Sequence, residues 1–301
     1  MELPDHLMQL LDAKTPYLVR RLIRALRYPP GSYYSPLPSL REVRRREAEI
    51  FGAASKARTL AGIDLNEQEQ LSLLEQLGAY YPEQPFPEKK EPHRRYFFAN
   101  DYFSYSDALF LYAMIRHARP ARIIEVGSGY SSCVMMDTNE LFFGGRIACC
   151  FIDPDLRRLR TLLTRADLAR IDGVEKPVQE INLRHFAALS AGDILFIDSS
   201  HVAKVGSDLN RILFEVLPVL PSGVLVHFHD VFWPFEYPKS WVYQGRAFNE
   251  VYLLRAFLQY NCAFKVILFT SYLEAFYRER LEAAMSLCLR RAGRSLWLQK
   301  V

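Results

Sequence analysis

The sequence predicts an α/β protein in which a doubly wound parallel sheet follows a helical N-terminal extension. From about residue 95 onward, short apolar runs rich in β-branched residues alternate with longer stretches of helical periodicity, the pattern of repeated strand and helix units. Before that point, helical periods are separated by proline-rich connectors such as PPGSYYSPLPS. A third observation is the segment ARIIEVGSGYSS at 121–132, where a buried strand breaks into a glycine turn and then a helix.

We therefore expect two parts, a helical extension or cap at 1–94 and the sheet domain at 95–301. The extension contains expected helices at 17–27, 40–52 and 67–81. Its arginine-rich stretch between Arg20 and Arg46 is a candidate partner or dimer face, so a homo-oligomer is one expectation.

The sheet domain is expected to begin with a helix at 106–118. The expected strands follow at 122–126, 147–152, 176–179, 193–197, 223–228, 264–269 and 295–299. The expected helices between and after them are 130–140, 155–168, 182–189, 205–217, 247–260 and 272–290.

The glycine turn after the first strand predicts a nucleotide-binding site. Gly127 and Gly129 allow backbone N–H groups to approach a ligand, and Asp153 at the end of the next strand can accept hydrogen bonds from both ribose hydroxyls. Ser132 stands where a dinucleotide-binding turn has its third glycine. This disfavours a Rossmann dehydrogenase, which stays open as an alternative.

Polar side chains follow several of the expected strands, at the edge where ligands bind in such sheets. They are Glu125, Asp153, Glu180, Asp198, and the pair His229 and Asp230. The alternative interpretation is that the carboxylates only cap the helices that follow the strands.

A second group of residues predicts acid–base or metal chemistry. Asp198 ends one strand and His201 follows it, while His227, His229 and Asp230 lie at the end of the next strand along the chain. Alternation places His227 and His229 on one face, so we expect at least one of them to turn toward Asp198. A carboxylate and a His-Asp pair can hold a divalent cation. A histidine base without metal and purely structural histidines are the alternatives.

Composition excludes several classes of protein. Half of the 301 residues are hydrophobic and 24% are charged, which is typical of a globular chain. The formal charge of +4 is small and spread along the chain, so nucleic acid is not an expected partner. No apolar run reaches the roughly 20 residues of a membrane span. The N-terminus lacks a signal-peptide pattern, and the five cysteines have no CxxC spacing, so a cytoplasmic protein with reduced thiols is expected.

The motifs together resemble those of a known family. The set IIEVGSG, FIDPD, DILFIDSSH, GVLVHFHDVF and SLWLQK is similar to the class I S-adenosylmethionine-dependent methyltransferases. Within them it looks most like the small-molecule and glycan O-methyltransferase branch. The resemblance covers about residues 95–301 and implies a Rossmann-like, seven-stranded sheet whose last strand is antiparallel.

The resemblance also implies roles for the residues of the glycine turn. Glu125, Gly127 and Gly129 would line the methionine end of S-adenosylmethionine, and Ser131 or Ser132 would donate to its carboxylate. Asp153 would hold the ribose, and Glu180 would contact the adenine. Asp198 is also expected among the cofactor-binding residues.

For the acceptor side, the resemblance implies magnesium held by Asp198, His229 and Asp230. His229 stands where the family usually has Asp, so manganese, iron or zinc are candidates beside magnesium. Without metal, His229 or His201 would be the general base.

The implied function is O-methylation of a small-molecule or sugar hydroxyl, with a glycan among the possible acceptors. The alternatives are a metal-dependent, oxygenase-like enzyme and a non-catalytic cofactor-binding protein on the same fold. The amide-Pro-Pro-aromatic loop that acts on exocyclic amines is absent after the fourth strand, where SSH stands instead. This again disfavours nucleic-acid substrates.

Overall fold

A computed structural model describes residues 28–53, 57–103 and 105–301 of the chain. The chain divides into two compact units. The smaller consists of residues up to 56 together with 238–247, and the larger of residues 57–237 and 248–301.

The larger unit is built on one seven-stranded sheet with the strand order β3-β2-β1-β4-β5-β7-β6. The strands are β1 (Arg122–Val126), β2 (Ala148–Ile152), β3 (Asp172–Val174), β4 (Ile194–Ile197), β5 (Leu225–Phe228), β6 (Phe264–Phe269) and β7 (Leu296–Lys300). Strands β1 to β5 pair in parallel, whereas β7 is antiparallel to both β5 and β6. The expected antiparallel last strand is confirmed.

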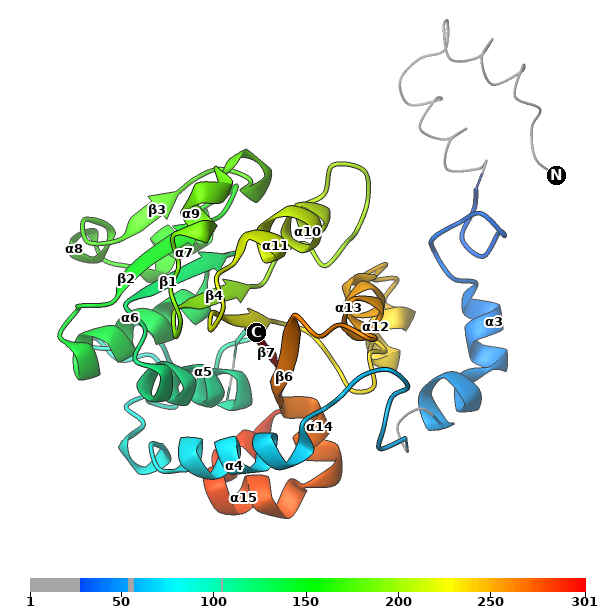
Figure 1. Cartoon of the computed structure of the whole chain (residues 1–301), viewed down its shortest axis with the longest axis horizontal. Helices are drawn as coiled ribbons and strands as arrows, with labels where there is room; N and C mark the ends of the chain where they lie inside the picture. Colours follow the sequence, from blue (N-terminus) through cyan, green and yellow to red (C-terminus); the bar gives the residue numbers. More distant parts are fainter. Residues whose placement is uncertain (1–27, 54–56, 104) are drawn as a thin grey trace, which may run out of the picture. The chain divides into compact units, whose positions relative to one another are not determined.

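Helices cover both faces of this sheet (Figure 1). Those of the larger unit are α4 (Glu67–Gly78), α5 (Tyr105–Ala118), α6 (Tyr130–Phe143), α7 (Arg157–Leu162), α8 (Arg165–Leu168), α9 (Leu183–Ala187), α10 (Asp208–Arg211), α11 (Leu217–Val219), α13 (Glu250–Leu258), α14 (Thr270–Phe276) and α15 (Arg278–Met285). Single turns of other helix types lie at η3 (Tyr81–Glu83), η4 (Val178–Glu180), η5 (Ile212–Val216) and η6 (Ser286–Arg290).

Burial explains why the central elements read as apolar in the sequence. Every residue of β4 and β5 is buried, because helices cover both faces of a parallel sheet. Helix α5 is buried along ten of its fourteen residues. The sheet edge that carries the carboxyl ends of β1, β2, β4 and β5 is thereby held on a rigid core.

One expected strand was wrong. The prediction placed a strand at 176–179, but β3 is Asp172–Val174 and residues Val178–Glu180 form a 3-10 turn. Pro177 lacks the N–H that a strand ladder needs, so the chain turns there, and the less apolar DGV segment pairs with β2 instead.

The larger unit extends further toward the N-terminus than the boundary expected at residue 94. Residues 57–94 belong to it, because α4 packs against α5, α15 and β6. The buried Gln70 side chain of α4 accepts a hydrogen bond from Phe269 N of β6 at 2.7 Å, which joins this helix to the sheet.

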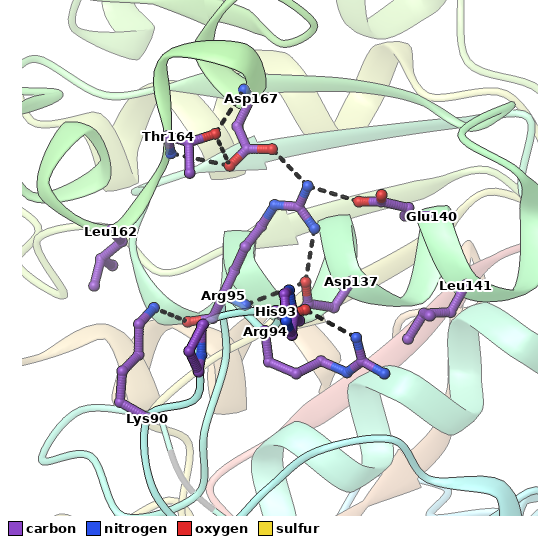
Figure 2. Close-up of a pocket in the computed structure, with 11 residues that line it drawn as sticks. Lys90, His93, Arg94, Arg95, Asp137, Glu140, Leu141, Leu162, Thr164 and Asp167 are labelled. Carbon is purple, nitrogen blue, oxygen red and sulfur yellow. Dashed lines mark hydrogen bonds and ion pairs between the residues drawn. The ribbon is translucent and has the colours of Figure 1, made fainter.

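A partly buried ion cluster joins the segment before α5 to helices α6 and α8 (Figure 2). The Arg95 guanidinium lies 2.8 Å from Asp137, 2.5 Å from Asp167 and 2.6 Å from Glu140. The N–H groups of Arg95 and Tyr96 also donate to Asp137, each at 3.0 Å. The cluster borders a cavity of about 400 Å³, and its carboxylates already have partners.

The smaller unit contains α3 (Leu40–Arg45), η1 (Glu49–Ala53) and α12 (Lys239–Tyr243). The Ser39 side chain caps α3 by accepting from Glu42 N. Glu47 joins the two chain segments of the unit, since it accepts from Lys239 at 2.6 Å and from the Tyr243 hydroxyl at 2.8 Å. The expected helix at 17–27 lies outside the described residues.

Within the part of the chain that the structure describes, no helix has the length and apolar character needed to cross a membrane.

Candidate functional site

A cavity of about 430 Å³ opens at the carboxyl ends of β1, β2 and β4. The glycine turn and Asp153, which predict a nucleotide site, lie at this same edge. The cavity is lined by Val126, Gly127, Ile152, Asp153, Pro154, Pro177, Val178, Gln179, Asp198, Ser199, Ser200, Lys204, Gly206, Ser207 and Asp208.

Gly127 occupies a position that only glycine can fill. Its φ is +89°, and a Cβ atom built there would lie 1.8 Å from the carbonyl oxygen of Asp198. Backbone hydrogen bonds hold this approach, because Gly127 N donates to Ile152 O and Asp198 N donates to Val126 O, each at 2.9 Å. The glycine therefore draws the ends of β1, β2 and β4 together.

Glu125 lies beneath the turn rather than in the cavity. It is completely buried and accepts hydrogen bonds from the hydroxyls of Ser131 and Ser132. Burial raises the pKa of Glu125 to about 8, against the two hydroxyls, which lower it. The serine hydroxyls expected to bind a ligand carboxylate point instead to Glu125, and all three residues brace the turn.

Asp153 lies at the tip of β2 and lines the cavity, as the sequence analysis expected of it. One of its oxygens accepts from Ser128 N at 2.8 Å, and the other accepts from Asp155 N at 2.8 Å. These two bonds fix the carboxylate while leaving acceptor capacity for a ligand hydroxyl.

The cavity combines apolar walls with polar groups. Ile152 and Val178 give it apolar walls, and the Ser199 hydroxyl is buried with no described hydrogen-bond partner. Glu180, the expected adenine contact, is exposed and is not among the lining residues. The turn at η4 brings Val178 and Gln179 to the cavity instead.

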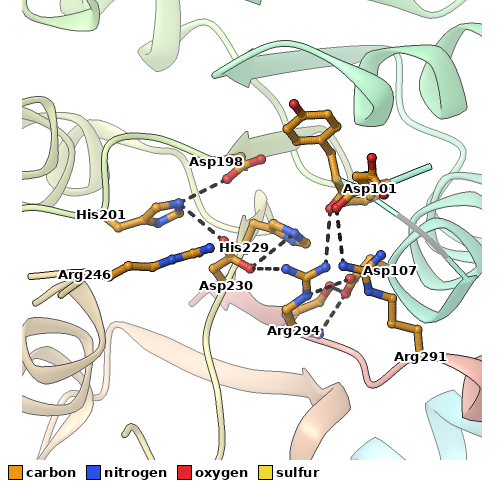
Figure 3. Close-up of polar contacts among 12 residues, drawn as sticks. Asp101, Asp107, Asp198, His201, His229, Asp230, Arg246, Arg291 and Arg294 are labelled. Atoms are coloured by element: carbon orange, nitrogen blue, oxygen red, sulfur yellow. Dashed lines mark hydrogen bonds and ion pairs between the residues drawn. The ribbon is translucent and has the colours of Figure 1, made fainter. Parts of the chain in front are cut away.

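The second cluster gathers around His201, at the tips of β4 and β5 (Figure 3). His201 Nε2 lies 3.4 Å from Asp198 Oδ1 and 3.7 Å from Asp230 Oδ2. On the other side of the ring, Nδ1 lies 2.7 Å from Glu250, whose side chain is almost fully buried. His201 and Asp230 both have positive φ, 59° and 58°, which is uncommon for residues with a side chain.

Neighbouring charges control the ionisation of this cluster. Burial opposes the ionisation of Asp198, but the His229 and His201 rings outweigh it and lower the pKa of Asp198 to about 2. Burial likewise opposes protonation of His201, yet Asp198 and Glu250 raise the pKa of His201 well above its usual value. Burial raises the pKa of Glu250 in spite of His201. The carboxylates on both sides of the ring therefore favour a proton on His201, and the ring must release that proton before Nε2 can accept one from a ligand or bind a cation.

Arg294 fixes Asp230 from the opposite side. Its guanidinium donates to Asp230 Oδ1 at 3.0 Å, and its Nε lies 3.6 Å from the buried carboxylate of Asp107. Asp107 in turn accepts from the backbone N–H of Arg294 at 2.8 Å and from the Ser295 hydroxyl at 3.0 Å. A chain of charges thus runs from α5 through Arg294 to the tip of β5.

The other two histidines of the sequence prediction lie on one face of β5, with ring centroids 5.7 Å apart. His227 is completely buried, stacks on Phe196 at 4.0 Å, and has no described hydrogen-bond partner for either ring nitrogen. Burial lowers the pKa of His227 well below its usual value, so the ring is neutral. His229 is also buried, with Nε2 3.7 Å from Asp230 Oδ1.

The residues present fit a divalent cation, with a change in the donor set. Three donor atoms lie within 4.8 Å of one another, one each from Asp198, His201 and Asp230. His229, expected in this set, is not part of the group, and His201 takes its place. The Glu250 contact leaves His201 Nε2 as the free donor, and metal-binding histidines commonly have such a carboxylate partner.

Sequence reasoning missed three residues of this site, namely Glu250, Arg294 and Asp107. Glu250 was hidden at the start of a helix, where an acidic residue has an ordinary explanation. Arg294 lies just before β7, whereas the predicted site residues all follow the carboxyl ends of strands. Because β7 is antiparallel, its beginning lies at the same edge as the carboxyl ends of β4 and β5. The sequence signal for Arg294 was its position directly before a strand expected to be antiparallel.

Comparisons with known proteins relate part of the larger unit to methyltransferases. A family model described as a methyltransferase domain matches residues 124–231, which include both clusters apart from Glu250, Arg294 and Asp107. An uncharacterized protein of Archaeoglobus fulgidus is 40% identical to the chain over 168 residues, which are 54% of this chain and 73% of that relative.

The chain is also similar to solved structures of methyltransferases. The methyltransferase PaMTH1 of Podospora anserina, bound to S-adenosylhomocysteine, is 14% identical, with 89% of this chain and 99% of that chain covered and a TM-score of 0.42. The O-methyltransferase TomG of Streptomyces achromogenes, in complex with S-adenosylmethionine, is 15% identical, with 86% and 96% covered and a TM-score of 0.39. The ligands named here are those of these two proteins.

Proposed function

Because this chain belongs to the class I S-adenosylmethionine-dependent methyltransferases, we propose that it methylates a hydroxyl oxygen of a small molecule or sugar at the His201 cluster. One observation carries the proposal. Asp198 lines the cavity on one side and lies 3.4 Å from His201 on the other. A methyl donor bound in the cavity and an acceptor bound at His201 would therefore both lie next to the Asp198 carboxylate.

The donor side of the proposal uses residues of the cavity. Asp153 would accept hydrogen bonds from the ribose hydroxyls, and Ile152 and Val178 would contact the adenine. Gly127 would present backbone to the ligand where a side chain cannot fit. S-Adenosylmethionine supplies a methyl group already activated by its sulfonium, which leaves the chain to position the acceptor and handle its proton.

On the acceptor side, His201 would handle the proton of the hydroxyl. In its neutral form the ring donates from Nδ1 to Glu250 and offers the lone pair of Nε2 to the acceptor. Glu250 would hold the ring in that tautomer, as a carboxylate orients a catalytic histidine in other enzymes. Asp198 and Asp230 would then stabilise the imidazolium that forms.

The same site could also act with the help of a divalent cation. Asp198, His201 and Asp230 would hold it, and it would lower the pKa of the acceptor hydroxyl. The mixed oxygen and nitrogen donors suit magnesium, manganese, iron or zinc. In this version the cation replaces the proton on His201 Nε2.

Calorimetry with S-adenosylmethionine, S-adenosylhomocysteine and NAD tests the donor side. The two sulfur-containing ligands should bind, and Asp153→Ala should weaken both by on the order of tenfold or more because it removes the ribose contact. Tight binding of NAD without binding of S-adenosylmethionine would contradict the proposal.

Conversion of S-adenosylmethionine to S-adenosylhomocysteine with a panel of sugars and catechols tests the acceptor side. Asp230→Ala should lose turnover while binding S-adenosylmethionine almost unchanged. Exhaustive chelation separates the two versions, since it stops the metal-assisted reaction and spares a reaction that uses His201 alone. Full turnover by Asp230→Ala under both conditions would exclude this cluster.

A further inference from the structure

A second set of metal-type donors lies away from the proposed active site, where β2, β3 and α9 meet. Cys150 Sγ, a carboxylate oxygen of Asp172 and a ring nitrogen of His185 all lie within 4.8 Å of one another. Each donor comes from a different element of the larger unit. None of the three lines the cavity or belongs to the His201 cluster.

The backbone holds two of the donors in place before any ligand arrives. Cys150 on β2 and Asp172 on β3 are partners in the parallel ladder, and neighbouring strands lie about 4.8 Å apart. Cys150 is buried, whereas Asp172 and His185 are exposed at the sheet edge. The arrangement is therefore a thiol at the bottom of a site whose other two donors can be reached from solvent.

The Cys150 thiol lies next to the Asp172 carboxylate. Burial and the adjacent Asp172 carboxylate raise the pKa of the Cys150 thiol to about 12. Among the described residues, no lysine or arginine forms an ion pair with Asp172. A divalent cation would neutralise the carboxylate and the thiolate together, because a bound metal displaces the thiol proton into solvent.

We propose that Cys150, Asp172 and His185 form a site for Zn²⁺, with water in the fourth position. Thiolate, imidazole and carboxylate are the three types of side-chain ligand that zinc takes in proteins. The thiolate disfavours magnesium and calcium, which prefer oxygen ligands. Three protein ligands and an open side match a tetrahedral ion that keeps one water.

The position of the site gives it a structural consequence. Asp172 and His185 lie on either side of the segment that includes Pro177, Val178 and Gln179, all of which line the cavity. A metal held by both residues would close this segment into a loop anchored on Cys150. Closing a loop reduces the freedom of its ends in the unfolded chain.

Titration of the full-length protein with Co²⁺ tests the site, because only a cobalt–thiolate bond gives a sulfur-to-metal charge-transfer band. The Asp198, His201 and Asp230 group contains no sulfur, so cobalt bound there lacks this band. The titration is made in a Cys262→Ser background, which removes the one exposed cysteine. We expect the band to saturate at about one equivalent of cobalt and to disappear when Zn²⁺ is added.

Matched variants assign the band to residues. Cys150→Ser should abolish it, and His185→Ala or Asp172→Asn should weaken cobalt binding on the order of tenfold or more. Cys149→Ser is the control, because Cys149 is the neighbouring thiol and contacts Asn139 and the Ile147 carbonyl instead. His201→Ala should leave the band unchanged.

His185→Ala also separates loss of cobalt binding from loss of folding, because His185 is exposed and its substitution leaves the buried core intact. Absence of the band in the Cys262→Ser protein would overturn the proposal. A band that survives Cys150→Ser, or that is lost equally in Cys149→Ser, would do so as well. None of these outcomes depends on methyl transfer.

Discussion

The Arg95 cluster and the His201 cluster have the same composition of charge, one cationic side chain among three carboxylates. Arg95 lies between Asp137, Asp167 and Glu140, and His201 lies between Asp198, Asp230 and Glu250. They differ in the cation, because an arginine stays charged at any pH of interest whereas a histidine can release its proton.

The surroundings of the two clusters also differ. Backbone N–H groups and the Thr164 hydroxyl complete the hydrogen bonding of the carboxylates around Arg95. Around His201, two residues have left-handed backbone and one carboxylate lines a cavity. The comparison teaches that a buried ion cluster serves structure where its cation is permanent and its partners are saturated. A cluster whose cation can lose its proton, and whose carboxylates can still accept hydrogen bonds, has the properties that the proposed chemistry at His201 requires.

The largest expected effect comes from removing the titratable cation. His201→Ala should lower the rate of S-adenosylhomocysteine formation by on the order of 10³, because the acceptor proton loses its receiving group. Affinity for S-adenosylmethionine, measured by calorimetry, should change little, since His201 is not among the lining residues of the cavity. An unchanged rate would place the acid–base chemistry elsewhere.

Removing the permanent cation should affect stability instead of rate. Arg95→Met leaves the buried carboxylates of Asp137 and Asp167 without their ion-pair partner, and should lower the free energy of unfolding by about 3 kcal/mol. Urea unfolding followed by circular dichroism measures the loss. The rate per folded molecule should stay near that of the wild type, and a large fall in that rate would remove the distinction between the clusters.

Arg294 connects the two kinds of behaviour, because it is a permanent cation that holds Asp230 of the titratable cluster. Arg294→Met should reduce kcat on the order of 30-fold while KM for S-adenosylmethionine stays nearly constant. Arg294→Lys should restore part of kcat, since it keeps the charge beside Asp107 and Asp230. Equal kinetics for the Met and Lys variants would show that the charge does not position Asp230.

Glu125 differs from the carboxylates of both clusters, because its described hydrogen-bond partners are two hydroxyls and not a cation. Its pKa is about 8 in the folded chain and about 4.3 in an unfolded one, so between these values only the folded state keeps the proton. The wild type should therefore lose stability relative to Glu125→Gln as pH rises through this window, by about 1.4 kcal/mol per pH unit. Above pH 8 the difference should be constant.

Urea unfolding of both proteins at several pH values between 4.5 and 8 measures this effect. Parallel stability profiles would mean that Glu125 is ionised in the folded chain. In that case the serine hydroxyls compensate for its burial as fully as a cation would.

The sequence was sufficient to predict those elements that depend on a local pattern of residues. The β1 turn, the tips of β2 and β4, and the antiparallel β7 all follow from apolar runs, glycine or the family resemblance. It failed at β3, where Pro177 and Val178 suggested a strand but the lack of a proline N–H ends pairing earlier.

The acceptor cluster could be predicted only in part because its geometry depends on distant contacts. Asp198 and Asp230 were named, yet the choice of His201 over His229 as third donor depends on Glu250, which lies 49 residues away from His201. The helix containing Glu250 is drawn to His201 by two backbone bonds, from Asn249 N and Glu250 N to the His201 carbonyl. No sequence period encodes such a contact.

The contact between Gly127 and the Asp198 carbonyl constrains how this protein can evolve or be redesigned. A larger residue at 127 would have to displace the strand end that carries Asp198, so the recess proposed for the donor and the place proposed for the acceptor depend on the same backbone contact. New acceptor preferences are therefore more accessible through β5, α13 and the chain before β7, which meet at the other side of the cluster. In this fold, the donor half is the fixed part and the acceptor half is the one free to vary.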